Sequence, residues 1–173
     1  MSPPKKRQGK QELIDALGMA FRQAQNRTQV FDELVAARLG INTTDLLCLD
    51  LIEQNQRLTA GKLAELAGLT TGAVTGVLDR LERLGYARRI RDERDRRRVF
   101  VELTDAAVER THAIYGPFKE EWDRLLSRYT VDELRLFVEM LGLGEEVGVR
   151  QVEHLRSLGV ERLPGFRLED GAT

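Results

Sequence analysis

The stretch that decides the fold runs from Leu63 to Thr104 and reads LAELAGLTTGAVTGVLDRLERLGYARRIRDERDRRRVFVELT. Its first part has the pattern of two short helices that cross steeply around a tight turn. Ala64 is the small residue needed at the crossing, and Gly68 permits the turn. Apolar residues then have to fill the angle between the two helices, and the sequence supplies Leu63, Ala67, Leu69, Val74 and Val77. This spacing predicts a helix-turn-helix rather than an ordinary helical hairpin.

The second of these helices is predicted to have one buried and one exposed face. At about 3.6 residues per turn, the apolar face comprises Val74, Val77, Leu78 and Leu81. The opposite face comprises Gly72, Thr75, Gly76, Asp79 and Arg83. Glycine on a water-facing helix is unfavourable by about 1 kcal/mol relative to alanine. A helix laid against the floor of the DNA major groove benefits from bare backbone, so this face is interpreted as the DNA reader. Asp79 is expected to pair with Arg83, four residues further on.

Several polar groups near this helix suit contact with DNA. Threonine hydroxyls can bind phosphates or base edges, and their methyl groups can contact thymine. The helix N-terminus adds a dipole that favours phosphate. The residues predicted to contact DNA here are Thr59, Lys62, Thr70, Thr71, Gly72, Ala73, Thr75, Gly76 and Arg80.

After Gly85 the apolar period changes from that of a helix to that of a strand. Residues 98–103 alternate, which places Val99, Val101 and Leu103 on one face, with 86–91 as the partner strand and 92–97 as the turn. Between residues 83 and 98 there are eight arginines and three acids, a net charge of +5 in a chain that carries only −1. Such a concentration is typical of a surface for a polyanion, and arginine suits the narrow minor groove. The alternative is a solvated hairpin laced with Arg–Asp pairs.

Amphipathic helices are predicted on both sides of this unit. A helix over residues 11–39 stops at Gly40, and the next, capped by Thr43 or Thr44, runs to about residue 54. Thr59 and Thr70 cap the two helices of the motif. A further helix starts at residues 104–105 and runs to about residue 129.

The C-terminal part is expected to be less regular. Thr130 and Glu133 form a capping box for another helix. Its signal weakens beyond Leu141 because three glycines follow, and residues 149–158 are interpreted as one more helix. The expected organisation is a basic disordered tail (1–10), a DNA-binding region (43–103), a helical dimerisation region (11–40 plus 104–158) and a C-terminal extension (159–173).

Residues 63–104 resemble the multiple-antibiotic-resistance regulator (MarR) family of bacterial transcription factors. The D-x-R signature of the family's wing corresponds to Asp95, Arg96 and Arg97, and it is followed by the alternating strand and by Leu103-Thr104. The resemblance implies a mainly α fold with a small β-hairpin wing, in which the winged helix-turn-helix is flanked by N- and C-terminal dimerisation helices. It further implies that Arg97 enters the minor groove, that Asp95 orients it, and that Arg96 lies near phosphate.

The same resemblance implies a homodimer on double-stranded DNA that reads a pseudo-palindrome, and a repressor that responds to a small lipophilic effector, often a phenolic anion. No ligand-binding residue is identified from the sequence. The helix that would line an effector pocket carries four candidates, for which a core or interface role is the alternative. They are His112, Tyr115, Phe118 and Trp122.

Other function classes lack the residues they need. No phosphate-cradling glycine loop and no HExxH, GxSxG or CxxC motif is present, so neither catalytic residues nor a cofactor are expected. Cys48 lies among leucines and is predicted to be buried and inert, while His112 and His154 are too far apart in sequence to suggest a metal site. No apolar run is long enough to span a membrane, and the protein is expected to be cytoplasmic. A winged-helix protein-interaction module and a ligand-independent architectural DNA-binding protein remain the alternatives.

Overall fold

The computed structural model describes residues 9–55, 57–92, 95 and 98–158. These residues form two compact units, one ending at Pro117 and the other beginning at Phe118. The elements are α1 (Lys10–Leu39), α2 (Thr43–Asn55), β1 (Leu58–Thr59), α3 (Ala60–Ala67), α4 (Thr71–Arg83), β2 (Ala87–Arg91), β3 (Val99–Leu103), α5 (Asp105–Leu126) and α6 (Val131–Ser157). The predicted tail up to residue 8 and the C-terminal extension lie outside the described residues.

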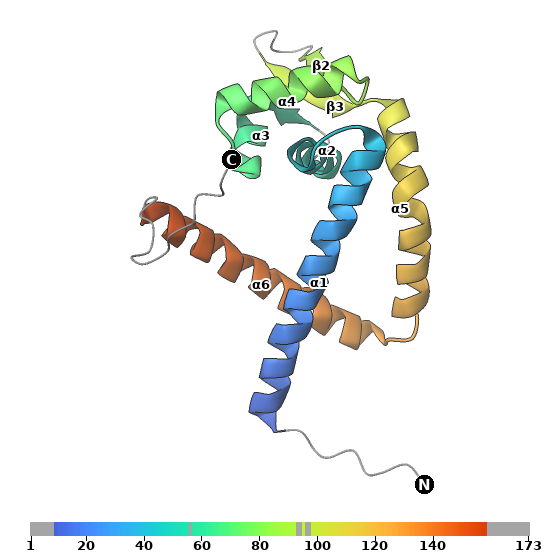
Figure 1. The fold of residues 1–173 in the computed structure, drawn as a ribbon, viewed down its shortest axis with the longest axis vertical. Helices are drawn as coiled ribbons and strands as arrows, with labels where there is room; N and C mark the ends of the chain where they lie inside the picture. The colour runs from blue at the N-terminus through green and yellow to red at the C-terminus, as the bar shows by residue number, and fades with distance from the viewer. Residues whose placement is uncertain (1–8, 56, 93–94, 96–97, 159–173) are drawn as a thin grey trace, which may run out of the picture. The chain divides into compact units, whose positions relative to one another are not determined.

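The hydrophobic core of the first unit is built around α2. This helix packs against the C-terminal part of α1, against α3 and α4, and against β3 (Figure 1). Leu49 and Ile52 of α2, Leu63 of α3, and Leu78 and Leu81 of α4 are almost completely buried. In contrast, residues 10–30 of α1 are all exposed, and this part of the helix extends away from the core (Figure 1).

The wing is a three-stranded antiparallel sheet in the order β1-β3-β2. Ala87 pairs with Leu103 and Arg91 with Val99, so the hairpin has the predicted partners. Val101 is buried while Val99 is 38% exposed, because the core lies under the base of the hairpin and not under its tip. The short strand β1 was not predicted; Leu58 pairs with Val101 and Thr59 with Phe100. Two residues are too few for a period-2 pattern to reveal a strand.

Two hydrogen bonds fix the start of α2 and the end of α1. The backbone N–H of Asp45 donates to Asn42 Oδ1 at 2.8 Å, so the cap of α2 is Asn42 and the expectation of Thr43 or Thr44 was wrong. The side-chain oxygen of Asn42 accepts from the backbone N–H three residues further on, which is the usual capping geometry. The buried Tyr86 hydroxyl donates to the carbonyl of Leu39 at 2.7 Å, which ties the end of α1 to the base of the wing.

The second unit contains the C-terminal part of α5 and the whole of α6. The predicted capping box is present: Thr130 Oγ1 accepts from the N–H of Glu133, and the Glu133 carboxylate accepts from the N–H of Thr130. The predicted break after Leu141 was wrong, because α6 is one continuous helix to Ser157 and its glycines have helical backbone angles. Extending a helix adds one hydrogen bond per residue, whereas restarting one requires a new nucleus, and this outweighs the cost of the glycines. None of the described helices is long and apolar enough to cross a membrane.

Candidate nucleic-acid interface

The helix-turn-helix is formed by α3, the turn at Gly68 and α4. Thr59 Oγ1 accepts from the backbone N–H of Lys62 at 3.3 Å, and Thr70 Oγ1 accepts from that of Ala73 at 3.2 Å. Both predicted caps are therefore confirmed. Gly68 has φ of +66°, a left-handed conformation that favours glycine, and its N–H bonds back to the last turn of α3. These local interactions fix where α4 begins.

One face of α4 is buried and the other is free. Val74, Val77, Leu78 and Leu81 are at most 2% exposed, as predicted. The N-terminal residues of the helix on the other side are exposed, with Gly76 half-buried. They are Thr70, Thr71, Gly72, Ala73 and Thr75.

The glycines of α4 are not required by the interior of the protein. Neither has positive φ, and a Cβ added to Gly72 would meet nothing within 4 Å. A Cβ on Gly76 would lie 3.7 Å from Arg80 Nη1, an ordinary contact. The fold itself would therefore accept alanine at both positions. The Thr75 hydroxyl donates to the carbonyl of Thr71 at 2.9 Å, which leaves its oxygen able to accept from a partner.

Arg80 connects α4 to α2. Its Nε and Nη2 donate to the two carboxylate oxygens of Asp45 at 3.1 and 2.7 Å. The Asp45 side chain is only 2% exposed, whereas that of Arg80 is 40% exposed, so a buried carboxylate is neutralised by a guanidinium that also reaches the surface. The bonds and charge of Asp45 raise the pKa of Arg80. Arg80 was predicted to contact DNA, and that role stays a prediction. In the structure, its Nε and Nη2 already donate hydrogen bonds to Asp45.

Asp79 does not pair with Arg83, so that expectation was wrong. The carboxylate of Asp79 lies 2.9 Å from Arg89 Nη2 of β2, and the same guanidinium also contacts Glu82. The backbone N–H of Arg89 donates to Glu82 Oε1 at 2.9 Å as well. The strand β2, which follows α4, folds back alongside this helix. Arg89 of β2 therefore lies closer to Asp79 than Arg83 of α4 does. Arg89 therefore connects the wing to α4.

The described arginines of the wing fall into two groups. Arg89 is neutralised by acids of α4, and Arg88 lies 3.5 Å from Glu102 across the hairpin. Arg83, the last residue of α4, and Arg91 and Arg98 of the wing are exposed and form no ion pair with any described residue. Among the described residues, part of the arginine excess is thus neutralised by nearby acids, though not by Arg–Asp pairs within the hairpin, and part remains available to a polyanion.

The turn of the wing is only partly described. The backbone N–H of Asp95 donates to Asp92 Oδ1 at 3.1 Å, and the N–H of Arg98 donates to the carbonyl of Asp95 at 2.8 Å. Asp95 is thus part of a hydrogen-bonded turn. Arg96 and Arg97 lie outside the described residues, so the proposed roles of all three stay predictions.

Two contributors to this interface were missed by sequence reasoning. Asp45 was not predicted to be a site residue, yet it is the buried partner of Arg80, 35 positions away. Glu82 was not noted at all, although it holds Arg89. A signal existed for Asp45, because it directly precedes Leu46 and lies one helical turn before Leu49, on the apolar side of the helix, where an acid requires a partner.

Cys48 is completely buried beside these groups. Burial first, and then the charge of Asp45, raise the pKa of its thiol to about 11, although Arg80 acts in the opposite direction. The thiolate is the reactive form of cysteine, so an inert thiol is expected. The part of the chain that the structure describes also holds no group of three or more potential metal ligands.

We therefore expect Cys48 to resist modification in the native protein. At pH 8 a pKa of about 11 leaves about one thiolate in a thousand, and the fold blocks access to that fraction. Iodoacetamide labelling followed by mass spectrometry is expected to be negligible in buffer and complete in denaturant. Rapid native labelling with unchanged circular dichroism would show that the thiol is accessible and reactive.

This geometry defines a winged helix-turn-helix, and comparison with known proteins agrees. Residues 41–99 match the MarR family. A relative from Bacillus subtilis (strain 168), the uncharacterized HTH-type transcriptional regulator YcgE, is 33% identical over 87% of this chain and 97% of its own length. The chain belongs to the MarR family of transcriptional regulators, whose members bind DNA through this fold.

Solved structures show the same fold. A crystal structure of MarR aligns with a TM-score of 0.52 and 26% identity over 78% of this chain and 98% of that one. A mutant of MepR from S. aureus, solved bound to an oligodeoxyribonucleotide, aligns with a TM-score of 0.52 and 22% identity over 82% of this chain and 97% of that one.

Proposed function

We propose that this regulator is a homodimeric repressor that places α4 in the major groove of a pseudo-palindromic operator and its wing in the adjacent minor groove. The carrying observation is the exposed N-terminal face of α4, where two glycines have no internal reason to be glycine. The exposed arginines of the wing supply positive charge for phosphates on one side of that face. The solved complex of the MepR mutant with DNA supports this arrangement by analogy of fold.

The dimer is supported by large apolar side chains that stay exposed in the described part of a single chain. Residues 13–21 of α1 include Leu13, Ile14, Leu17 and Phe21, each at least 50% exposed. Within the single chain no residue of α6 is buried, although the helix carries many large apolar side chains. Surfaces of this size and character mark an interface, and a two-fold dimer is the simplest closed arrangement. Such a dimer would present two copies of α4 to half-sites about 10–10.5 bp apart.

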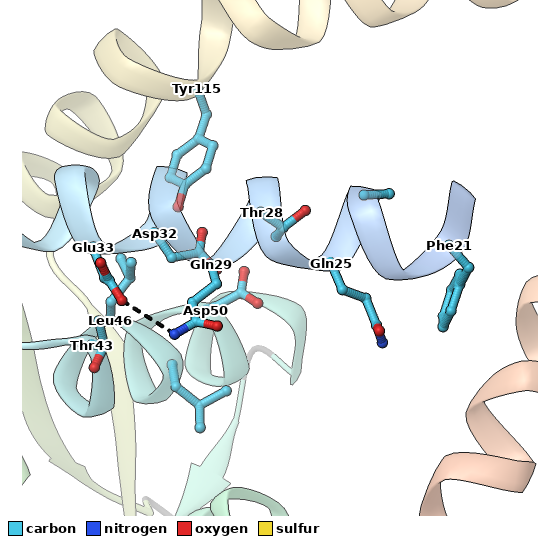
Figure 2. A pocket seen from close by; sticks show the side chains of 12 residues that line it. Phe21, Gln25, Thr28, Gln29, Asp32, Glu33, Thr43, Leu46, Asp50 and Tyr115 are labelled. Carbon is cyan, nitrogen blue, oxygen red and sulfur yellow. Dashed lines mark hydrogen bonds between the residues drawn. The ribbon is translucent and has the colours of Figure 1, made fainter. Parts of the chain in front are cut away.

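The response to an effector is supported by a cavity of about 550 Å³ in the first unit. Residues of α1, α2 and α5 line it, and Figure 2 shows the Tyr115 side chain directed into it. Of the four aromatic candidates, Tyr115 is the one at this cavity. Phe118 and Trp122 stack on each other with ring centroids 6.3 Å apart in the second unit, and His112 is exposed.

The helix α2 joins this cavity to the reader helix. Leu46 and Asp50 of α2 line the cavity, while Asp45 of the same helix binds Arg80 of α4. A ligand that shifts α2 would therefore move the point at which α4 is held. This connection supports release of the operator on binding as the mode of regulation. A chromosomal operator would place this function in the cytoplasm.

The test is binding to genomic DNA fragments over a series of salt concentrations. The logarithm of affinity is expected to fall linearly with that of salt, by about 0.9 per phosphate contacted. Arg97→Ala should weaken binding strongly with little change in melting temperature, whereas Lys119→Ala, an exposed residue of α5, should leave affinity unchanged. Light scattering on the same samples should show a dimer, free and on DNA. A flat salt response, or a monomer that binds, would contradict the proposal.

A further inference from the structure

The cavity between α1, α2 and α5 combines apolar walls with unusual charge. Phe21 of α1 and Leu46 and Leu47 of α2 supply apolar surface, and Tyr115 of α5 covers one side (Figure 2). The Tyr115 ring is held edge-on against Phe31, with centroids 5.6 Å apart. A volume of about 550 Å³ lies within the range of sites for drug-sized molecules. The cavity therefore has the size and the walls of a small-molecule site.

All the charged side chains among its described lining residues are acidic. Asp32, Glu33 and Asp50 line the cavity, and none of its described lining residues is lysine, arginine or histidine. Glu33 accepts from Gln29 Nε2 at 3.3 Å and Asp50 from Gln54 Nε2 at 2.9 Å. Asp32 and Asp50 form no ion pair with a described residue, unlike Asp45, which lies deeper and has Arg80. The lining thus leaves carboxylates facing the cavity without a cation.

The surroundings of two of these carboxylates, Asp32 and Asp50, disfavour the charged form. Burial first, and then the neighbouring charge of Asp50, raise the pKa of Asp32. Burial also raises the pKa of Asp50, against the opposing hydrogen bond from Gln54. The pKa of Tyr115 is raised by burial and by both carboxylates, so its hydroxyl stays neutral and, in Figure 2, points toward Asp32. A positive charge in the cavity would stabilise the charged forms of Asp32 and Asp50, and a negative charge would destabilise them.

We propose that the cavity selects a lipophilic organic cation, with its charge between Asp32 and Asp50 and its apolar part against Phe21, Leu46 and Tyr115. The ring of Tyr115 would add a cation–π contribution. This inference rests on the proposed effector response and names its ligand class, which differs from the phenolic anion that the family resemblance implies. A metal ion is disfavoured by the apolar walls and by the absence of any cluster of three potential ligands among the described residues.

The test uses two probes of nearly equal shape and opposite charge, the tetraphenylphosphonium cation and the tetraphenylborate anion. Calorimetric titration of the full-length protein is expected to show saturable binding of the cation and at least tenfold weaker binding of the anion. Equal affinity for both, or preference for the anion, would overturn the proposal. Absence of saturable binding by the cation would overturn it as well.

Variants locate the probe. Asp32→Asn and Asp50→Asn should each weaken cation binding by about tenfold, the order expected for a partly screened charge pair. Asp123→Asn removes the same charge from an exposed site of α5, eight residues beyond Tyr115, and should change nothing. Circular dichroism melting curves and operator affinity without probe confirm that each variant is folded. Loss of affinity in Asp123→Asn equal to that in Asp32→Asn would place the cation elsewhere.

The two proposals fail in different ways. If the cation binds as expected but leaves the operator complex intact, the ligand class of the cavity holds and the effector response of the proposed function fails. If the anion binds more tightly than the cation while the protein still binds its operator as a dimer, the ligand class is wrong and the DNA-binding function stands.

Discussion

Replacing Gly72 by glutamate is expected to abolish operator binding without unfolding the protein. The position lies in the first turn of α4 and is exposed, and a Cβ added there would meet no heavy atom within 4 Å. A carboxylate there would meet phosphate and base edges if α4 lies in the major groove, and like-charge contact costs several kcal/mol. We expect affinity to fall by about a hundredfold or more in a mobility-shift titration.

Gly72→Ala makes this prediction sharper, because its two effects have opposite signs. Alanine is favoured over glycine in a helix by about 1 kcal/mol, which should raise the melting temperature by about 2–4 °C. Operator affinity should nevertheless fall, since the added methyl group holds the backbone away from the groove. Gly116→Ala in α5, where space is also open, serves as the control and should raise the melting temperature alone. An unchanged operator affinity in Gly72→Glu would show that this face does not read DNA.

Replacing Arg80 by alanine is expected to have the largest effect on stability. The substitution leaves the carboxylate of Asp45 buried and without the two hydrogen bonds that it accepts from the guanidinium. Removing one partner of a buried ion pair is costly because the other charge stays desolvated. Since the Arg80 side chain is 40% exposed, the loss is expected below the extreme for such pairs, at roughly 5–10 °C in melting temperature.

Two comparisons separate this role from direct DNA contact. Arg83→Ala lies three residues further along the same helix, at an exposed position with no ion pair to a described residue, and should change the melting temperature by about 1 °C or less. The double variant Asp45→Ala with Arg80→Ala should lose less than the sum of the two single losses, because each removes the same interaction. A wild-type melting temperature in Arg80→Ala, with operator binding lost, would mean that Arg80 acts only at the DNA.

The local features of the motif could be predicted because they depend on neighbours in the chain. Thr59 and Thr70 cap helices through N–H groups three residues away, and Gly68 occupies a left-handed turn that favours glycine. The buried face of α4 follows from the helical period alone. These are short-range consequences of backbone geometry, so the order of the residues was sufficient to anticipate them.

The partners of charged side chains could not be predicted in the same way. Asp79 has Arg83 within reach on its own helix, yet it binds Arg89, because the following strand folds back across α4. Asp45 and Arg80 are 35 positions apart, and only the packing of α2 against α4 brings them into contact. The continuity of α6 through its glycines was missed for a related reason, since propensity at single residues does not include the cooperativity of the whole helix.

The order of the residues is enough to identify this chain as a winged helix-turn-helix regulator, to place glycines and threonines on the exposed face of α4, and to show that arginines are concentrated between residues 83 and 98. Which of the described arginines are neutralised and which stay exposed follows only from the folded arrangement, as does the set of acids that face the cavity between α1, α2 and α5. The difference lies in the distance over which each interaction acts. Helix periods, caps and turns are set within a few residues, whereas the energy of a charge depends on every group that folding brings near it.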